Sequence, residues 1–459
     1  MMNKKMKKVV LFLLVCVGVF AMAACGKETN GAPNPYATEP PRITEAAEPS
    51  LTDVPTATVA PSATPEPTAT STPIPSPTST PTPEVDWYQA MLDRSVMSTG
   101  NNARLKKVIE KARSGEIVNI ATLGGSITEG ANATPWTLGY AYRFAEKFAA
   151  EYGVNGGENI NYVNAGIGGT PSALGVMRFE RDVLAALGAE PDLFVIEFEV
   201  NDYAEATNGR AYESLVYQVL SQTNDAAVIM VFAVRDDMWN VQGEHYPIAL
   251  RYEIPVVAIK NAVEPAIKMG QLDKTVFFSD AYHPTNYGHD IMSDCIMQLV
   301  KVIDAEEADE RKTLPENAIK GRDFVGTKMI DSTTEGIVFE LGAFTKVDSE
   351  IQRFSPKMIP SFPNNWMHDS EGGNDSFKMT LTCKNLLMNY KTGSAKFGTA
   401  EVYVDGNLVK SLNGSGGWNG CNVVLLIDEK EAAEHVVEIR MAEGQEDKAF
   451  TIYAFGYTQ

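Results

Sequence analysis

Three side chains of this sequence have the types and order that acyl transfer by a nucleophile requires. Ser126 follows Gly124 and Gly125 directly after an apolar run, and Asp280 and His283 stand together much later in the chain. A serine hydroxyl is a weak nucleophile until a base takes its proton, and histidine supplies that base near neutral pH. The Asp-x-x-His spacing lets one loop present both the imidazole and the carboxylate that orients it. We therefore predict that Ser126 is the nucleophile, His283 its general base and Asp280 the residue that orients the imidazole.

Two further segments between these residues could stabilise negative charge on an acyl oxygen. Gly168-Gly169 and Asn201-Asp202 each follow an apolar, strand-like run. A tetrahedral oxyanion needs preorganised hydrogen-bond donors, and losing one of them typically costs about 3 kcal/mol of transition-state stabilisation. Glycine suits such a position because its backbone can approach the substrate closely. The predicted donors are the backbone N–H groups of Ser126 and Gly169 and the side-chain amide of Asn201.

Each of these motifs alone has an ordinary structural explanation. Gly-Gly-Ser is a common turn, Asn-Asp often forms a turn or caps a helix, and an isolated Asp-x-x-His is frequent. Their joint order and their positions after strand-like runs favour a catalytic site. Among the other histidines, we expect His245 in a loop and His289 on the last helix, neither with a direct catalytic role. His368 and His435 are expected to be structural or exposed.

The segments around the candidate residues alternate between helical and strand-like patterns from about residue 87 to 305. The expected strands are 117–121, 160–164, 193–198, 227–233 and 275–279, and the expected helices are 102–112, 140–152, 173–187, 211–220, 256–269 and 286–303. Continuous Val, Ile and Phe runs that alternate with helices predict a parallel sheet covered on both faces. Every candidate residue then follows the carboxyl end of a strand, where open α/β sheets place their sites.

From about residue 318 to 459 the apolar periodicity changes to two. Alternating segments at 376–382, 399–404, 436–441 and 450–455 predict strands, and Asp405-Gly406 predicts a two-residue hairpin turn. This pattern favours a β-sandwich of jelly-roll type, which we expect to be a carbohydrate-binding-like domain. Trp366 and Trp418 lie in loop-like surroundings. An exposed tryptophan can stack on a sugar face, although packing at a sandwich edge is its commoner role.

Four blocks of the sequence resemble, in order, those of the SGNH (GDSL-type) hydrolases. They are Gly124-Gly-Ser-Ile-Thr128, Asn164-Ala-Gly-Ile-Gly-Gly-Thr170, Glu197-Phe-Glu-Val-Asn-Asp202 and Asp280-Ala-Tyr-His-Pro284. The resemblance spans residues 100–303 and implies a flavodoxin-like, three-layer α/β domain, placed at 86–310, that hydrolyses esters without a metal or another cofactor. Two positions depart from the family pattern. Gly125 stands where the family usually has an Asp directly before the nucleophile. Glu199 stands where the family has a Gly two residues before the Asn. Neither position supplies a catalytic group.

Residues 1–24 are predicted to be a secretory signal. Four lysines precede an apolar run, and small residues lead into Cys25. This arrangement resembles the lipobox of bacterial lipoproteins, which implies cleavage before Cys25, a diacylglyceryl group on its sulfur and an anchor in the cell membrane. An uncleaved anchor helix is the alternative, although the apolar run is short for a bilayer span. Residues 25–85 are dominated by Pro, Thr, Ser and Ala, so we expect an extended, solvated tether with a reach on the order of 150 Å.

The composition restricts the partners and the redox chemistry. A formal charge of −20 at pH 7 disfavours nucleic acid and anionic membrane surfaces as partners. Of the five cysteines, Cys16 and Cys25 belong to the signal region, which leaves Cys295, Cys383 and Cys421. Three thiols do not make a disulfide framework, and we expect them to be buried and free. The Cys and His spacing predicts no metal site, and the oligomeric state is left open.

Together these observations predict a serine esterase that faces the cell wall or the exterior and removes small acyl groups, acetyl first, from an extracellular polysaccharide. A lipase, lysophospholipase or thioesterase of the same superfamily is the first alternative, and a series of acyl-chain lengths would separate it. A non-catalytic glycan-binding surface protein is the second alternative. Failure of a serine-directed phosphonate to label Ser126 would favour it.

Overall fold

A computed structural model describes residues 86–352, 355 and 358–459. The predicted signal, the lipidation at Cys25 and the tether at 25–85 lie outside the described residues. The described residues belong to one compact unit, Pro81–Gln459, so the predicted boundaries at 310 and 318 stay a prediction. Within the described part of the chain, no helix is both long enough and apolar enough to cross a membrane.

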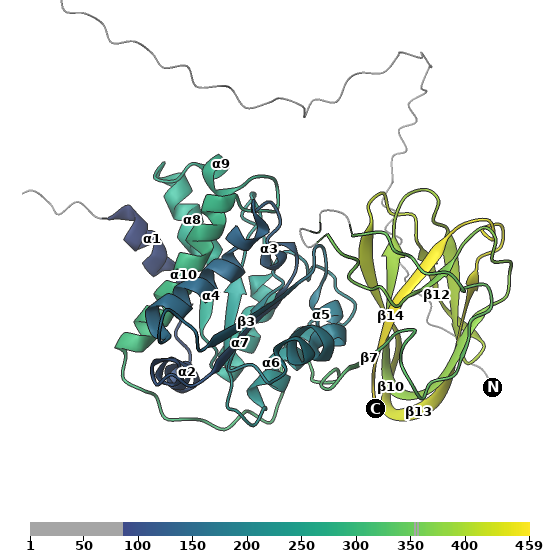
Figure 1. Ribbon diagram of the computed structural model, residues 1–459, viewed down its shortest axis with the longest axis horizontal. Helices are drawn as coiled ribbons and strands as arrows, with labels where there is room; N and C mark the ends of the chain where they lie inside the picture. Colours follow the sequence, from purple (N-terminus) through teal and green to yellow (C-terminus); the bar gives the residue numbers. More distant parts are fainter. Residues whose placement is uncertain (1–85, 353–354, 356–357) are drawn as a thin grey trace, which may run out of the picture. The chain divides into compact units, whose positions relative to one another are not determined.

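The first half of this unit is built on a six-stranded sheet (Figure 1). The strands are β1 (Val96–Ser98), β2 (Val118–Gly124), β3 (Ile160–Gly166), β4 (Leu193–Glu197), β5 (Ala227–Phe232) and β6 (Val256–Ala258). Their spatial order is β1-β6-β5-β4-β2-β3. All neighbours are parallel except β1, which is antiparallel to β6. The five parallel strands have the flavodoxin-like order, in which the first strand lies between the second and the third, so the predicted fold class is confirmed.

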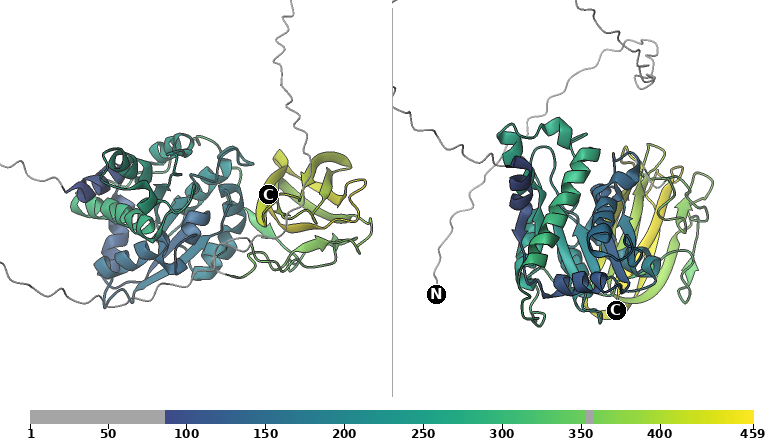
Figure 2. Two further views of the ribbon diagram at one scale, coloured as in Figure 1. Left: turned by 90° about the horizontal axis from the view of Figure 1, so that it is seen from above. Right: turned by 60° about the vertical axis from the view of Figure 1, so that its left-hand side comes forward.

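Helices cover both faces of this sheet (Figure 2). Alternate residues of a strand point to opposite faces, and here the side chains on both faces are apolar, so each face is buried by its own layer of helices. One core cluster joins Ile120 and Val195 to the helices α1 (Trp87–Ser95), α2 (Ala103–Arg113), α4 (Tyr140–Tyr152), α8 (Ile259–Lys268) and α10 (Asn286–Ala305). The other cluster joins Ala121 and Phe194 to α5 (Ser172–Phe179), α6 (Arg210–Leu220) and α7 (Gln242–Tyr252). Four shorter elements complete this half among the described residues: α3 (Ser126–Glu129), the 3₁₀ turn Trp136–Leu138, the π-helical turn Glu180–Ala185 and α9 (Lys274–Phe277).

Three sequence predictions about this half were wrong. The expected strand at 275–279 is the short helix α9 (Lys274–Phe277), which the Asp273 side chain caps. The fifth parallel strand is instead β6, which the sequence pattern had merged into the following helix. Its three buried residues are too few to show a strand period. His245, expected in a loop, lies on α7.

The second half is an antiparallel β-sandwich, as predicted. Its strands are β7 (Lys328–Ile330), β8 (Phe339–Glu340), β9 (Trp366–His368), β10 (Phe377–Thr392), β11 (Thr399–Val404), β12 (Asn407–Asn413), β13 (Gly420–Met441) and β14 (Phe450–Thr458). A register shift between Cys383 and Asn385 divides the long pair β10–β13, so that its two halves belong to different layers. One layer contains β12, β11 and β8, and the other contains β14, β7 and β9. The predicted hairpin at Asp405-Gly406 is present, with positive φ at both residues.

The sandwich and the α/β half share an apolar core. Leu387, Cys421 and Tyr453 of the sandwich belong to the same buried cluster as helices α5 and α6. Arg210 on α6 forms a two-pronged ion pair with Asp428 of β13, with distances of 2.9 and 2.8 Å. Cys295, Cys383 and Cys421 are free and buried, which confirms that prediction.

Candidate active site

The turn between β2 and α3 places Ser126 at the carboxyl edge of the sheet. Ser126 is the first residue of α3, so its N–H group has no acceptor within the helix. The turn depends on Gly124, because a Cβ atom there would lie 2.1 Å from Oγ1 of Thr128 and 2.4 Å from the carbonyl oxygen of Glu197. The hydroxyl of Ser126 therefore stands at the end of a tightly packed strand-to-helix turn.

The loop between α9 and α10 brings His283 and Asp280 to this serine. The distance from His283 Nε2 to Ser126 Oγ is 2.8 Å. His283 Nδ1 lies 2.9 and 3.0 Å from the two carboxylate oxygens of Asp280. The side-chain amide of Asn132 donates to Asp280 over 2.8 Å. The structure thus joins the three predicted residues in a hydrogen-bonded series with the geometry of nucleophile, base and orienting carboxylate.

The loop also keeps Asp280 ionised. Burial would raise the pKa of this carboxyl group, but hydrogen bonds from the His283 side chain and from the backbone N–H groups of Tyr282 and His283 lower the pKa to about 2. A carboxylate that stays negative through the neutral range can stabilise an imidazolium on His283.

The three predicted oxyanion donors border the same serine. A Cβ atom on Gly168 would lie 3.7 Å from Cβ of Ser126, so the Gly168-Gly169 loop adjoins Ser126. Asn201 Oδ1 would lie 2.0 Å from a Cβ atom on Gly125, which places the Asn201 side chain beside the turn. Gly169 has a φ of 69°, a left-handed conformation that favours glycine. The backbone N–H of Gly169 and the Asn201 amide donate to no acceptor among the described residues, so both can serve a ligand.

The same contact bears on one departure from the family pattern. The Asn201 side chain occupies the space that a side chain at position 125 would need, so any larger residue there would require the Asn201 amide to move. The other departure, Glu199, is fully buried beside His245, with a distance of 2.7 Å from Glu199 Oε1 to His245 Nδ1. Sequence reasoning missed this pair. The signal that could have found it is the run Glu197-Phe-Glu-Val-Asn-Asp202, which contains three carboxyl groups at and just after the end of an apolar strand.

The remaining histidines are structural. His289 lies on α10 as predicted and is buried, with Nε2 3.1 Å from the carbonyl oxygen of Ala131. Burial lowers the pKa of His289 to about 4. In the sandwich, His368 is held by two backbone carbonyl oxygens and His435 by Asp405.

The sandwich reaches the candidate site. A Cβ atom on Gly169 would lie 2.3 Å from the indole ring of Trp418, so this ring packs directly on the Gly168-Gly169 loop. Ser355 donates a 2.9 Å hydrogen bond to Glu129, whose other carboxylate oxygen accepts the N–H of Gly168 over 2.7 Å. Trp366 is only 3 % exposed and packs in the sandwich core, so it is not a sugar-binding residue.

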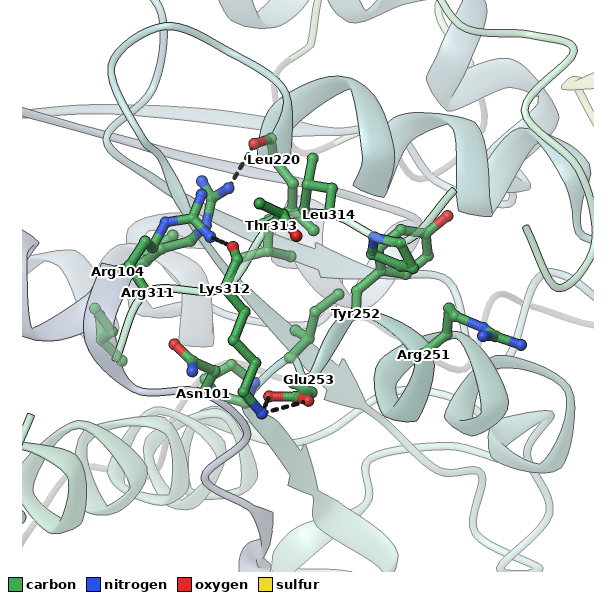
Figure 3. A pocket seen from close by; sticks show the side chains of 16 residues that line it. Asn101, Arg104, Leu220, Arg251, Tyr252, Glu253, Arg311, Lys312, Thr313 and Leu314 are labelled. Atoms are coloured by element: carbon green, nitrogen blue, oxygen red, sulfur yellow. Dashed lines mark hydrogen bonds and ion pairs between the residues drawn. The ribbon is translucent and has the colours of Figure 1, made fainter. Parts of the chain in front are cut away.

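A separate cavity lies near the amino ends of the sheet strands, away from Ser126 (Figure 3). It contains Arg104, Arg311 and Lys312, and each of these cations has protein partners. Lys312 Nζ, for example, lies 2.8 and 2.7 Å from the two carboxylate oxygens of Glu253. The cavity shares no residue with the candidate active site.

Comparison with known proteins agrees with this architecture. Residues 122–291 match the GDSL-like lipase/acylhydrolase family. No curated protein matches the chain. Among solved structures, a two-domain esterase active on acetylated mannans is 27 % identical, with a TM-score of 0.69, over 80 % of this chain and 99 % of the other. A structure of a two-domain esterase active on acetylated mannans, co-crystallised with mannopentaose, gives 26 % identity and a TM-score of 0.69, over 80 % of this chain and 98 % of the other.

These matches extend through both the α/β half and the sandwich, as their coverage requires. The chain therefore contains a hydrolase domain of the GDSL-like lipase/acylhydrolase family and is a carboxylic ester hydrolase.

Proposed function

We propose that this chain is an esterase that removes O-acyl groups, acetyl first, from an extracellular polysaccharide, with an acetylated mannan as the first substrate to test. The observation that supports a sugar substrate best is the contact of Trp418 with Gly169. A tryptophan ring from a β-sandwich stands there at the oxyanion loop, and it is 37 % exposed. An aromatic ring that is still partly open to solvent can stack on a sugar ring while the ester reacts. The structurally similar two-domain esterase is active on acetylated mannans, which supports the same substrate class.

A row of aromatic side chains on the α/β half supports the same proposal. Tyr203, two residues after Asn201, is 74 % exposed and its ring centroid lies 5.7 Å from that of Trp239. The guanidinium group of Arg235 lies 5.3 Å from the Trp239 ring and 5.0 Å from the ring of Tyr282, the neighbour of His283. Exposed and half-buried aromatic rings interleaved with a charged group form a surface suited to sugars, which present both C–H and hydroxyl groups.

The proposed reaction follows from the geometry at Ser126. The hydroxyl oxygen attacks the acyl carbon while His283 Nε2, 2.8 Å away, takes the proton. The oxyanion is held by the N–H groups of Ser126 and Gly169 and by the Asn201 amide. The bond to the sugar oxygen then breaks, and His283 returns the proton to that oxygen, which leaves an acyl-enzyme. Water, activated by His283, repeats the sequence and releases the carboxylic acid and the free serine.

The test is acetate release from acetylated mannan, xylan, pectin and peptidoglycan by residues 86–459. The Ser126→Ala variant is the matched control. We expect release from acetylated mannan that the variant lacks. Cleavage of small acyl esters without release from any polymer would contradict the polysaccharide proposal and favour a lipid or thioester substrate.

We also propose that Cys25 is lipidated and holds the enzyme on the outer face of the cell membrane. The lysine-rich start, the apolar run and the small residues before Cys25 support this location. Metabolic labelling with a fatty acid should mark the full chain and not its Cys25→Ser variant. Equal labelling of the full chain and the Cys25→Ser variant would contradict lipidation at Cys25.

A further inference from the structure

Three ionisable side chains that the proposed reaction does not use are buried around the turn that carries Asn201. Glu199 is 0 % exposed, His245 is 1 % exposed and Asp202 is 8 % exposed. His245 Nδ1 lies 2.7 Å from Glu199 Oε1, and His245 Nε2 lies 3.4 Å from Asp202 Oδ2. Burying charges is expensive even when they are paired, and an apolar cluster of similar volume often stabilises a fold better. A role in arranging the site would explain why the chain has ionisable groups here.

Asp202 links the two loops that supply oxyanion donors. Its Oδ1 accepts the backbone N–H of Ser172 over 2.7 Å, and Ser172 begins α5 three residues after Gly169. The backbone N–H groups of Asn201 and Asp202 both donate to the carbonyl oxygen of Phe198, which makes a tight turn after β4. This carboxylate therefore spans from the loop of one donor, the Asn201 amide, to the loop of the other, the Gly169 N–H.

His245 contacts one residue before Asn201 in the turn and one residue after it. Its imidazole bonds Glu199, two residues before the asparagine, and faces Asp202, one residue after it. The ring stacks on Tyr212 with a centroid distance of 3.7 Å and an angle of 11°, so it has little freedom to rotate. The backbone N–H of Val241, just before α7, donates to the carbonyl oxygen of Glu199 and ties the helix to the same turn.

We propose that His245 is a positioning residue for the oxyanion hole: it fixes Asp202, and through the Asp202–Ser172 bond it fixes the separation of the Asn201 amide and the Gly169 N–H. The inference rests on the proposed roles of these two donors. Donors act on a developing oxyanion only when they are held within about 0.5 Å of the productive geometry. The hydrogen bond between Asp202 and Ser172 joins the two loops and so constrains the separation of their donors, which neither loop could constrain by itself.

The test compares Asp202→Ala, Asp202→Asn and His245→Asn with the unchanged enzyme on a small acetate ester. Asp202→Ala removes the bond to Ser172, and we expect kcat to fall about 10- to 100-fold with little change in KM, as for a small misplacement of a catalytic group. Asp202→Asn retains an oxygen that can accept the Ser172 N–H and should recover most of kcat. His245→Asn should lower kcat in the same direction. Glu244→Gln, an exposed carboxyl on the same helix, is the control and should change neither constant.

A boronic acid that forms a tetrahedral adduct with Ser126 separates positioning from folding. Its affinity should fall in step with kcat in Asp202→Ala and His245→Asn, because the adduct needs the same donors. If both variants lower only the unfolding temperature and leave kcat and boronic acid affinity unchanged, the cluster is structural and the proposal is wrong. If Ser126→Ala still hydrolyses the ester, the proposed site itself is wrong, whatever His245 does.

Discussion

At the scale of single residues, the size of the residue at position 125 decides whether the Asn201 amide can take its position. The Asn201 side chain fills the position that a Cβ atom at residue 125 would take, 2.0 Å from Oδ1. A larger residue must displace the amide that is proposed to bind the oxyanion. The absence of a side chain at position 125 therefore leaves the space in which the Asn201 amide lies.

Gly125→Ala should lower kcat about 100-fold or more, the usual effect of losing one oxyanion donor. KM for a small ester should change little, because the displaced amide acts on the transition state more than on the bound ester. Steady-state kinetics measure both constants. Gly243→Ala on α7, where a Cβ atom would contact nothing within 4 Å, is the matched control. Equal kcat in the two variants would show that Asn201 relaxes without loss.

Glu197 is a second residue whose surroundings have a testable effect, because they raise the pKa of its carboxyl group in the folded protein. Its side chain is fully buried beneath the nucleophile turn, with Oε2 3.0 Å from the Thr128 hydroxyl. Burial raises the pKa of Glu197 to about 8; the Thr128 hydrogen bond opposes this shift and the charge of Glu199 adds to it. The folded protein therefore keeps a proton on Glu197 at pH values where the unfolded chain has already lost it.

This difference predicts how stability depends on pH. Between the ordinary glutamate pKa, about 4.3, and about 8, the unfolded chain binds fewer protons at this position, so the free energy of unfolding falls as pH rises. Glu197→Gln, neutral at every pH, should remove that part of the fall. Urea unfolding at about pH 5 and pH 8 measures it, with the exposed Glu443→Gln as control. An unchanged pH dependence in Glu197→Gln would mean that Glu197 is ionised in the fold.

At the scale of elements, the loop between β12 and β13 brings a residue of the sandwich to the catalytic edge of the α/β sheet. Trp418 lies in this loop and packs on Gly169, and Asn419 donates a 2.6 Å hydrogen bond to the carbonyl oxygen of Ile351. The loop is thus bound to the sandwich through Asn419, while its tryptophan packs against the α/β half. A substrate at Ser126 would meet both domains.

Trp418→Ala should raise KM for an acetylated mannan oligosaccharide about tenfold, as expected for the loss of one aromatic stacking contact. kcat for a small acetate ester should stay within about twofold, because the ring touches no reacting group. Tyr403→Ala, an aromatic change on β11 within the sandwich, is the control. If both substrates lose kcat equally in Trp418→Ala, the ring serves to hold Gly169 and does not bind sugar.

At the scale of the whole molecule, the two halves pack together as one compact unit. Leu387 and Tyr453 of the sandwich share a buried cluster with α5 and α6, and a Cβ atom on Gly456 would lie 2.4 Å from Cγ of Met177. The segment before β7 is also bound to the α/β half, since the buried carboxylate of Glu213 accepts the backbone N–H of Ile319 over 2.8 Å. Removing the sandwich would expose the apolar surface of α5 and α6 that packs against it.

Truncation to residues 86–327 should therefore lower the unfolding temperature strongly and reduce hydrolysis of small esters as well as polymers. The physical reason is the loss of buried apolar contacts on α5, whose preceding loop supplies Gly169. Circular dichroism melting and ester assays on the same preparation measure both effects. A truncated protein that melts like the full chain and cleaves small esters normally would show that the halves are independent.

Much of this protein was determined by the sequence alone, because local patterns depend on a few neighbouring residues. The apolar runs around Ile120 and Val195 predicted the parallel strands, Asp405-Gly406 predicted its hairpin, and the Asp-x-x-His spacing predicted the pairing of Asp280 with His283. Only the tertiary structure decided the contacts between distant segments. His245 meets Glu199, Asn201 fills the space at Gly125, and Trp418 covers Gly169. Such contacts depend on how helices and the sandwich pack on the sheet, and no period or motif in one segment specifies the position of another.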